Sequence, residues 1–543
     1  MRTTRKTNWA GLLLFAASII HSLATVHYVD VNNPTPTPPF TNWSTAATTI
    51  QDAIDAAAKG DLILVTNGIY ETGGRVGSII QAGFGTNRVI ITTALTVQSV
   101  NGPDVTIIRG RQSPSSAAVR CVLVTNNATL SGFTLTNGGN VSTSGDGGGV
   151  FGLGGSPPFP GAGIVSNCVI TGNSSPFGGG AYGVTLIGCV VTRNTAHLAG
   201  GGARYCALTN CTLSANSVDF GDGGGASSSG LYNCQLNSNS ASSGGGAESC
   251  TLSRCRLTGN LAAYGGGADF SMLDNCLVVS NAALRSGGGL NTCFASNCTV
   301  VANSATESAG GAACGGTING FYPVLANCIL YSNTAPSKPN YSEEGTLNFS
   351  CTTPLPTNGI GNFTNAPLFI DSLNNNFRLQ SNSPCINAGL DASASSVRDL
   401  DGRTRVVGGQ VDLGAYEFQG PGVGEFCAWL EQFSFLTDGS VDFSDADRDG
   451  MNNWQEWRAG TVPSDATSVL RLLSPEIAGS DVIVSWSSVV GRKYRLERSS
   501  DLSAHPAFVT LTSDLAGLAG VTTYVDTNAA SAGVFFYRVG VQP

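Results

Sequence analysis

A repeat of about 22 residues occurs at least eight times between Cys168 and Thr334. Each copy contains a cysteine and, five residues later, an asparagine; three glycines follow in the middle copies. The cysteines are Cys168, Cys189, Cys211, Cys234, Cys255, Cys276, Cys298 and Cys328. The asparagines are Asn173, Asn194, Asn216, Asn239, Asn260, Asn281, Asn303 and Asn333. A fixed period in this range predicts a solenoid, in which one small unit stacks on the next.

The residues within each copy favour strands over helices. Three consecutive glycines would break a helical repeat. The copies instead contain short aliphatic runs such as 276–279, separated by Asn and Gly, which are typical of strands and tight bends. One copy is long enough for three short strands and three bends. We therefore expect an all-β chain, a parallel β-helix whose coils lie about 4.8 Å apart.

Equivalent positions of successive coils should form ladders. The asparagines suit an internal bend, because their amides can bond the backbone or the next asparagine. The glycine triplets suit a corner with positive φ or close backbone approach. Triplets begin at Gly178, Gly200, Gly223, Gly244, Gly265 and Gly287. The expected interior residues are Ile170, Val191, Leu213, Leu236, Leu257, Val278, Val300 and Leu330. Residues 153–163 and the insertion between Cys298 and Cys328 should leave the coils as loops.

Residues 48–60 predict a short amphipathic helix ahead of the repeats, with a Thr cap and a final Gly. Such a helix can cap the open end of a solenoid. The run TIQDAIDAAAKGDLILVTNGIYETGG and the repeats resemble secreted bacterial proteins of the right-handed, pectin-lyase-like β-helix class over roughly residues 27–420. The resemblance implies the fold and leaves activity open, since the class contains lyases, hydrolases, epimerases and non-enzymatic adhesins.

Residues 1–24 have the pattern of a signal peptide, with basic residues, an apolar stretch from Trp9 to Ile20, and small residues before a cleavage point after Ala24. We expect a secreted or cell-surface protein without a transmembrane segment in the mature chain, and a monomer. The net charge of −9 argues against a nucleic-acid partner.

The sixteen cysteines raise the question of disulfides, because exported chains often contain them. Stacked cysteines on parallel strands behave as small apolar core residues, and direct pairing along the stack is geometrically awkward. We expect the eight periodic cysteines to be reduced and buried. A shorter series is Cys206, Cys250, Cys293 and Cys314, of which the last two lie on neighbouring coils. Cys351 and Cys385 are the better disulfide candidates.

The chain changes character after the β-helix, which we assign to residues 25–361. Residues 362–420 resemble the bacterial choice-of-anchor Q region that closes such β-helices, which implies surface sorting in relatives. Residues 470–543 contain spaced strand patterns and predict a small β-sandwich of fibronectin type III character. Trp486 and Tyr537 are its expected core aromatics.

Residues 421–469 contain a calcium-loop pattern of the EF-hand type. The expected calcium ligands are Asp445, Asp447, Asp449, the carbonyl of Met451, Asn453 and Glu456. Gly450 supplies the sharp turn, and hard Ca²⁺ takes six to eight oxygens in this arrangement. The loop also resembles dockerin and thrombospondin type 3 calcium repeats. Val462 stands where a second loop usually has Asp, so we expect one good site, and its role can be structural.

One polar ladder deserves weighing as a catalytic site. Two residues after each glycine triplet the coils carry Tyr182, Arg204, Ser227, Glu248, Asp269 and Asn291. Glu248 and Asp269 should lie about 5 Å apart and could share a proton, hold Ca²⁺ or act as an acid and nucleophile pair on a glycan. We expect the ladder to face outward, because burying an isolated stack of charges is costly. An ordinary solvated polar ladder is the alternative.

Two functions remain open from the sequence. The first is a calcium-stabilised surface or extracellular protein that binds a polysaccharide or another cell-surface ligand. The second is a polysaccharide lyase or glycoside hydrolase that uses Glu248, Asp269 and Arg204. A groove lined by Tyr182, Arg204 and Tyr264 would favour the enzyme, and a flat polar face would favour binding.

Overall fold

The computed structural model describes most of the chain after the predicted signal peptide. The described residues are 24–77, 85–113, 117–140, 146–153, 163–342, 344–380, 383–394, 396–407, 410–419, 423–435, 441, 444–501 and 508–542. The signal-peptide prediction therefore lies outside the described residues except for Ala24, and most of the loop predicted at 153–163 lies outside them too. Among the described helices, none combines the length and apolar character needed to cross a bilayer.

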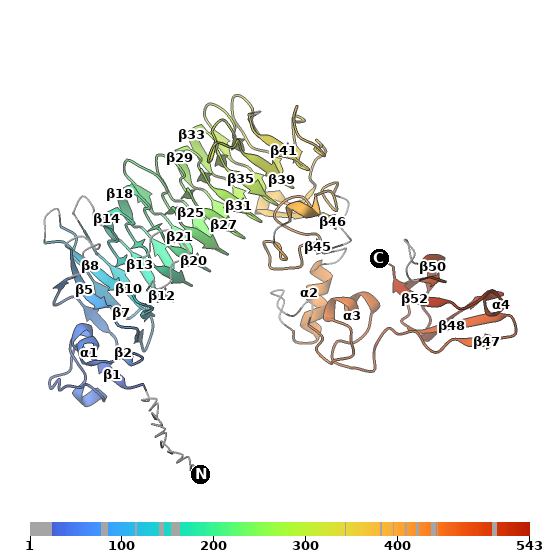
Figure 1. The fold of residues 1–543 in the computed structure, drawn as a ribbon, viewed down its shortest axis with the longest axis horizontal. Helices are drawn as coiled ribbons and strands as arrows, with labels where there is room; N and C mark the ends of the chain where they lie inside the picture. Colours follow the sequence, from blue (N-terminus) through green and yellow to red (C-terminus); the bar gives the residue numbers. More distant parts are fainter. Residues whose placement is uncertain are drawn as a thin grey trace, which may run out of the picture.

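Three long sheets form the parallel β-helix that the repeat predicts (Figure 1). Sheet 1 contains β1 (Val26–Val29), β2 (Leu62–Val65), β6 (Thr96–Ser99), β9 (Thr129–Ser131), β12 (Ile164–Ser166), β16 (Thr185–Ile187), β20 (Ala207–Thr209), β24 (Gly230–Tyr232), β27 (Thr251–Ser253), β31 (Met272–Asp274), β35 (Phe294–Ser296), β39 (Val324–Ala326) and β41 (Thr346–Asn348). Sheet 2 contains β3 (Gly68–Tyr70), β7 (Thr106–Arg109), β10 (Thr134–Thr136), β13 (Val169–Thr171), β17 (Val190–Thr192), β21 (Thr212–Ser214), β25 (Gln235–Asn237), β28 (Arg256–Thr258), β32 (Leu277–Val279), β36 (Thr299–Val301), β40 (Ile329–Tyr331) and β42 (Cys351–Thr352). Sheet 3 contains β4 (Arg75–Val76), β5 (Thr86–Ile91), β8 (Val119–Val124), β11 (Val150–Phe151), β15 (Ala181–Tyr182), β19 (Ala203–Arg204), β23 (Ala226–Ser227), β26 (Ala247–Glu248), β30 (Ala268–Asp269), β34 (Leu290–Asn291) and β38 (Ala312–Ala313).

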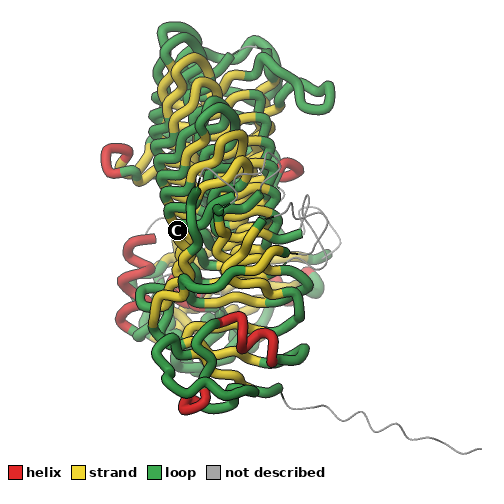
Figure 2. The backbone as a smooth tube through the Cα atoms, turned by 90° about the vertical axis from the view of Figure 1, so that its left-hand side faces the viewer, coloured by secondary structure: helices red, strands yellow, loops and turns green. Residues whose placement is uncertain are grey.

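Two short sheets bridge sheets 2 and 3 along the coil. They contain β14 (Ser174–Phe177), β18 (Thr195–Ala199) and β22 (Ser217–Val218), and further along β29 (Leu261–Tyr264), β33 (Ala282–Ser286) and β37 (Ser304–Ala305). A view turned by 90° shows the stacked strands of successive coils (Figure 2). Helix α1 (Ile50–Ala56) buries Ile50, Ala53 and Ile54 near the first strands, and Thr49 caps it as predicted.

A continuous asparagine ladder holds the bend after sheet 2. The Asn194 Oδ1 atom accepts hydrogen bonds from the backbone N–H of Asn173 at 3.0 Å and from its Nδ2 atom at 2.9 Å. The Asn194 Nδ2 group donates to the Ile170 carbonyl at 2.8 Å and to Asn216 at 3.0 Å. The pattern repeats to Asn333 and continues to Asn340, which the spacing did not identify. The predicted ladder is confirmed: its amides accept from the backbone N–H group at each bend and donate to a carbonyl of the preceding coil.

The glycine corners are confirmed for both expected reasons. Gly200 has φ +68°, a conformation that side chains rarely adopt. A Cβ atom on Gly201 would lie 2.4 Å from the Ser217 carbonyl oxygen, so only glycine allows the coils to approach this closely. The first position is Ala309 in a later copy, with φ +55°.

The interior is a stack of cysteine and aliphatic side chains. All eight periodic cysteines are free and buried, and the aliphatic residues predicted for the interior are fully buried. Burial raises the pKa of Cys168, Cys206 and Cys250 to about 12. The prediction of a disulfide between Cys351 and Cys385 is wrong for this structure: both are free, buried thiols that hydrogen bond within one apolar cluster.

The residues after the last coil form short antiparallel strand pairs instead of further coils. They contain the pairs β43 (Phe369–Asp371) with β44 (Asn376–Leu379), and β45 (Val406–Val407) with β46 (Gln410–Val411). Phe377, Leu400 and Tyr416 pack against Leu277 and other outward side chains of sheet 2. The region thus covers the flank of earlier coils (Figure 1).

The C-terminal part contains two short helices and the predicted sandwich. The helices are α2 (Val423–Gln432) and α3 (Asn453–Ala459). One sheet of the sandwich has the order β47 (Glu476–Ala478), β48 (Asp481–Ser488), β51 (Gly520–Asp526), and the other has β50 (Val509–Ala516), β49 (Lys493–Ser499), β52 (Phe536–Val541), with α4 (Ala529–Ala532) between β51 and β52. Trp486 is fully buried as predicted, whereas Tyr537 is only partly buried against the core.

We predict that Asn239→Leu lowers the free energy of unfolding by roughly 1–3 kcal/mol, because the Leu213 carbonyl and the Asn216 N–H group and amide lose their partners. Denaturant unfolding measures this. Asn237→Leu, on the outer side of the same coil, is the matched control and should unfold like the wild type. Equal stability of both variants would show that the ladder contributes nothing.

We also predict that the folded protein reacts slowly with a thiol reagent, because the periodic cysteines are buried and out of reach of the reagent. Denaturation should release at least these eight thiols. Finding most of them in disulfides by mass spectrometry would refute the packed cysteine interior.

Candidate functional site

The predicted polar ladder lies on the outer face of sheet 3. The alanines that precede its residues, such as Ala203 and Ala247, are fully buried in the core. Since side chains alternate along a strand, the next residues point outward, as expected. Cα partners run in register from Tyr182 to Arg204, Ser227, Glu248, Asp269 and Asn291. The structure therefore brings the three catalytic candidates onto one ladder, with Ser227 between Arg204 and Glu248.

Aromatic rings surround the arginine end of the ladder. Tyr182 stacks on Phe151 with ring centroids 5.6 Å apart and meets Tyr205 edge to face at 5.5 Å. The Arg204 guanidinium carbon lies 4.3 Å from the centroid of the Phe177 ring and 4.9 Å from that of Tyr205. Burial, with Asp146 next, raises the pKa of Tyr182 to about 12, so its hydroxyl remains a hydrogen-bond donor at neutral pH. This end combines apolar ring faces with a fixed positive charge.

Asp269 and Glu248 occupy the other end of the ladder, and of the two only Glu248 is accessible. Asp269 is 1% exposed and accepts hydrogen bonds from Asn291 Nδ2 at 2.7 Å, the Phe270 N–H at 3.0 Å and the Ser243 hydroxyl. Glu248 is partly exposed and accepts from the Ser227 hydroxyl at 3.0 Å. Asp269 is thus held by neighbours, whereas Glu248 can reach a ligand.

The acidic residues influence one another's proton affinity. Burial raises the pKa of Asp269 to about 6, and the charge of Glu248 acts in the same direction. Burial and Glu248 also raise the pKa of Asp222, while Arg204 opposes this. The arrangement provides a carboxyl group that exchanges a proton near neutral pH, but its burial keeps that group from direct contact with a large substrate.

Sequence reasoning named only Tyr264 from the second row of this site, which the bridge between Ser243 and Tyr264 reveals. Phe177, Asp222 and Ser243 come from the position just before each glycine triplet, and isolated bridges place this position of successive coils side by side. Because the first glycine has no side chain, the two rows approach each other across it: a Cβ atom on Gly200 would lie 2.7 Å from the Arg204 Cβ atom. The residue before each triplet was therefore the available signal.

The predicted calcium loop folds through its own carboxylates. Asp445 accepts from the Arg448 N–H at 2.7 Å and from the Gly450 N–H at 3.0 Å, and Gly450 adopts φ +97°. Asp449 accepts from the Met451 N–H at 2.7 Å. Asn452 then caps α3 reciprocally with Gln455, so that Asn453 and Glu456 lie in the first turn of this helix. All predicted ligand residues belong to this one turn-and-helix unit.

Several oxygens in the loop are buried without a hydrogen-bond partner. They are Asp447 Oδ2, Asp449 Oδ2, Asn453 Oδ1 and Glu456 Oε2. Asp445, Asp447 and Asp449 have oxygens within 4.8 Å of one another and form the one such acidic group found among the described residues. Burial, with Asp447 and Asp449 next, raises the pKa of Glu456 to about 7. Orphaned buried oxygens beside mutually repelling carboxylates fit a hard cation.

Helix α3 connects this loop to two neighbours. Trp454 and Trp457 pack on Phe426 of α2 with ring centroids 4.9 and 5.4 Å apart. Arg492 of the sandwich donates to the Trp457 carbonyl at 2.9 Å, and the Leu470 N–H lies 3.3 Å from the Met451 Sδ atom. The loop is therefore in direct contact with the start of the sandwich.

Comparisons with known proteins show distant likenesses of shape. No family model matches the chain, and no curated protein matches it. Among solved structures, pectate lyase Pel9A is 16% identical, with 72% of this chain and 96% of that chain covered and a TM-score of 0.42. XylC in complex with xylose is 8% identical, with 73% and 99% covered and a TM-score of 0.35. A tailspike protein, gp49 from Acinetobacter baumannii bacteriophage Fri1, is 10% identical, with 95% and 84% covered and a TM-score of 0.29.

Proposed function

We propose that this is an exported, calcium-stabilised β-helix protein that binds a polysaccharide or a cell-surface glycan on the outer ladder of sheet 3. The observation that carries the proposal is one outward ladder that holds the partly exposed Tyr182 and Arg204 on neighbouring coils and Glu248 two coils further on, with the Tyr205 ring against Tyr182. Ring faces pack against the apolar faces of sugars, and flanking charged groups hydrogen bond their hydroxyls. A regular ladder suits a linear polymer.

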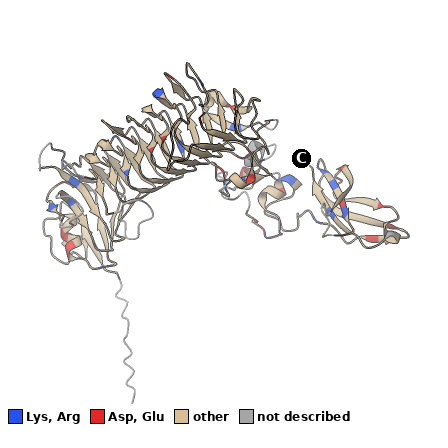
Figure 3. Cartoon of the chain, turned by 45° about the horizontal axis from the view of Figure 1, so that its top comes forward, with Lys and Arg blue, Asp and Glu red and all other residues tan. Residues whose placement is uncertain are grey.

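Two further features support a glycan as ligand. A hollow of about 560 Å³ spans the coils that carry Tyr182 and Arg204 and the coils before them; it is lined by Ser174, Ser175, Pro176, His197, Gln112, Ser113, Gly139 and Asn140. Figure 3 shows the Lys and Arg residues of the described part of the chain scattered along its length, and the net charge is −9. This distribution disfavours nucleic acid as partner. Secretion or surface attachment follows from the predicted signal peptide.

A polysaccharide lyase or glycoside hydrolase is the second candidate. It is favoured by the raised pKa of Asp269 next to Glu248, since paired carboxyl groups with separated proton affinities can divide acid and base roles. Against it stands the enclosure of Asp269, whose two oxygens are both occupied by hydrogen bonds. We therefore assign Glu248 and Arg204 to ligand contact and Asp269 to positioning Asn291 and Ser243.

The calcium part of the proposal rests on the orphaned oxygens of the loop. Asp445, Asp447, Asp449, Asn453 and Glu456 would supply side-chain oxygens and Met451 its carbonyl. A bound Ca²⁺ would supply positive charge that cancels the repulsion among these carboxylates. Its binding free energy would add to the local stability of α3 and of the contacts that α3 makes with the sandwich.

We predict that Arg204→Ala with Glu248→Gln weakens binding to the preferred polysaccharide at least about tenfold, because one cation and one anion leave the ladder. Retention on cellulose, xylan, chitin, alginate and polygalacturonate measures binding. Arg193→Ala is the matched control: it removes an exposed arginine at a corner where Ala215 and Ala302 already occur with the same positive φ.

Assays for reducing ends and unsaturated products on the same polymers separate the two candidate functions. Retention without products supports binding. Products that the wild type releases and Glu248→Gln does not would show that the protein is an enzyme rather than a binding protein. A folded wild type that neither binds nor cleaves any glycan would refute both.

For calcium, we predict one bound ion. Chelation should speed proteolysis between residues 420 and 470, because without the ion the carboxylates repel one another and the loop loses its order. Asp445→Ala with Glu456→Gln should mimic chelation, and the β-helix should stay intact. Calorimetry and limited proteolysis measure this, and Trp454 and Trp457 should report it by fluorescence. Asp465→Asn, an exposed residue beyond the loop, is the control. Equal protease resistance with and without calcium, together with no heat of binding, would refute the site.

A further inference from the structure

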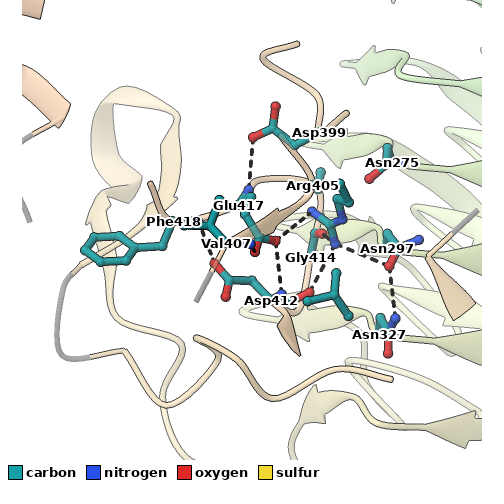
Figure 4. Close-up of polar contacts among 12 residues, drawn as sticks. Asn275, Asn297, Asn327, Asp399, Arg405, Val407, Asp412, Gly414, Glu417 and Phe418 are labelled. Atoms are coloured by element: carbon teal, nitrogen blue, oxygen red, sulfur yellow. Dashed lines mark hydrogen bonds and ion pairs between the residues drawn. The ribbon is translucent and has the colours of Figure 1, made fainter. Parts of the chain in front are cut away.

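A group of buried charged residues lies where the region after the last coil meets the β-helix (Figure 4). Asp399, Arg405 and Asp412 are fully buried, and Glu417 is 5% exposed. All four come from residues 396–419, around the β45 and β46 hairpin. The group plays no part in the glycan ladder or the calcium loop.

The arginine connects this group to the β-helix. The Arg405 Nη2 atom donates to the Gly414 carbonyl at 2.7 Å, the Asp412 carbonyl at 3.1 Å and Asn297 Oδ1 at 3.3 Å. Asn297 also accepts from Asn327 Nδ2 at 3.0 Å, on the next coil. The Arg405 Nη1 atom lies 3.9 Å from Glu417 Oε2. The contacts visible in Figure 4 therefore form part of the docking interface.

The three carboxyl groups fix the loops around them by accepting backbone N–H groups. Asp399 accepts three such bonds, and Asp412 and Glu417 accept two each. The donors are the N–H groups of Asp401, Arg403 and Glu417 for Asp399, of Asn387 and Phe418 for Asp412, and of Val407 and Asp412 for Glu417. Unfolding of this region would break these hydrogen bonds together.

The charges in this interface do not balance. Three carboxyl groups face one guanidinium group, and a buried unpaired charge is costly. Asp401, the nearest further acid, is bound by Arg378 at 2.6 and 2.7 Å and lies 3.4 Å from Arg256, so these arginines are already engaged. On the β-helix side Arg405 faces the neutral amides of Asn297 and Asn327, and Asn297 in turn donates to Asp274, another acid. The Arg254 guanidinium lies against Gly402.

We propose that docking of residues 364–419 onto the flank of the β-helix takes up protons, so that this region is a pH-controlled clamp, tight in mildly acidic surroundings and loosened in alkaline ones. Protonation relieves the excess of buried carboxyl groups over arginine that the backbone N–H groups do not offset, and so does separation from the β-helix. Separation would uncover the apolar outer side chains of sheet 2, Leu277, Val279 and Val301.

The direction of the pH effect follows from the carboxyl groups. Burial, followed by the charge of Asp412, raises the pKa of Glu417 from 4.5 to about 8. Burial likewise raises the pKa of Asp399 and of Asp412 from 3.8 to about 6. A carboxyl group with a raised pKa in the docked state stabilises docking fully below its unfolded value and loses that contribution as the pH rises through the docked value. Docking should therefore weaken between about pH 5 and pH 8.5.

Hydrogen exchange of the full-length protein, converted to protection factors at each pH, tests the clamp. We expect protection of peptides within 364–419 to fall at least about tenfold between pH 5.5 and 8.5, while peptides of the asparagine ladder stay protected. Binding of a dye specific for exposed apolar surface should rise over the same range. Protection of residues 364–419 that is constant across this range in the wild type would overturn the proposal.

Variants identify the groups responsible. Glu417→Gln removes the carboxyl group with the highest pKa, so its protection should change with pH at least about threefold less than in the wild type. Glu71→Gln, a half-exposed residue on an early coil, is the control and should behave like the wild type. If Glu417→Gln docks but keeps the full pH dependence, Glu417 is not the responsible group and the proposal fails. If it does not dock, the wild-type series alone decides.

Discussion

The buried asparagine ladder is the interaction on which the rest of this structure depends. At each coil one amide oxygen accepts two hydrogen bonds from the preceding coil, and the amide nitrogen donates both to a backbone carbonyl and to the next amide. An unpaired backbone group at a buried bend would cost a few kcal/mol. The ladder removes this cost at every coil and fixes the coils in one register. The glycine corners then allow the close approach that this register requires.

A fixed register decides which surface chemistry the chain can offer. Every outward position of sheet 3 becomes a column, so Tyr182, Arg204 and Glu248 lie on one ladder although they are far apart in sequence. The same rigidity provides the flat flank of sheet 2 on which residues 364–419 dock. The function of this solenoid is therefore determined by the few coils on which larger or charged side chains take the place of small polar residues.

Periodicity explains what the sequence could predict. The coil length, the asparagine ladder, the buried cysteines and the outward polar ladder each repeat, so local reasoning transferred from copy to copy. The calcium site stays a prediction; the sequence could propose it because its expected ligands lie within twelve residues. The unpaired state of Cys351 and Cys385, the row containing Asp222 and Ser243, and the Arg405 group were not predictable. They depend on contacts between distant or non-repeating segments, and no spacing in the sequence records them.

A double-mutant cycle on the ladder tests the central claim most directly. Asn216→Ala and Asn239→Ala remove amides that bond each other on neighbouring coils, whereas Asn216→Ala and Asn303→Ala remove amides that are not in contact. Denaturant unfolding of the single and double variants gives the coupling free energy. We expect a coupling free energy of about 0.5–3 kcal/mol for the neighbouring pair and additivity for the distant pair. Additivity for both pairs would show that the asparagines act independently and that the ladder does not hold the coils together.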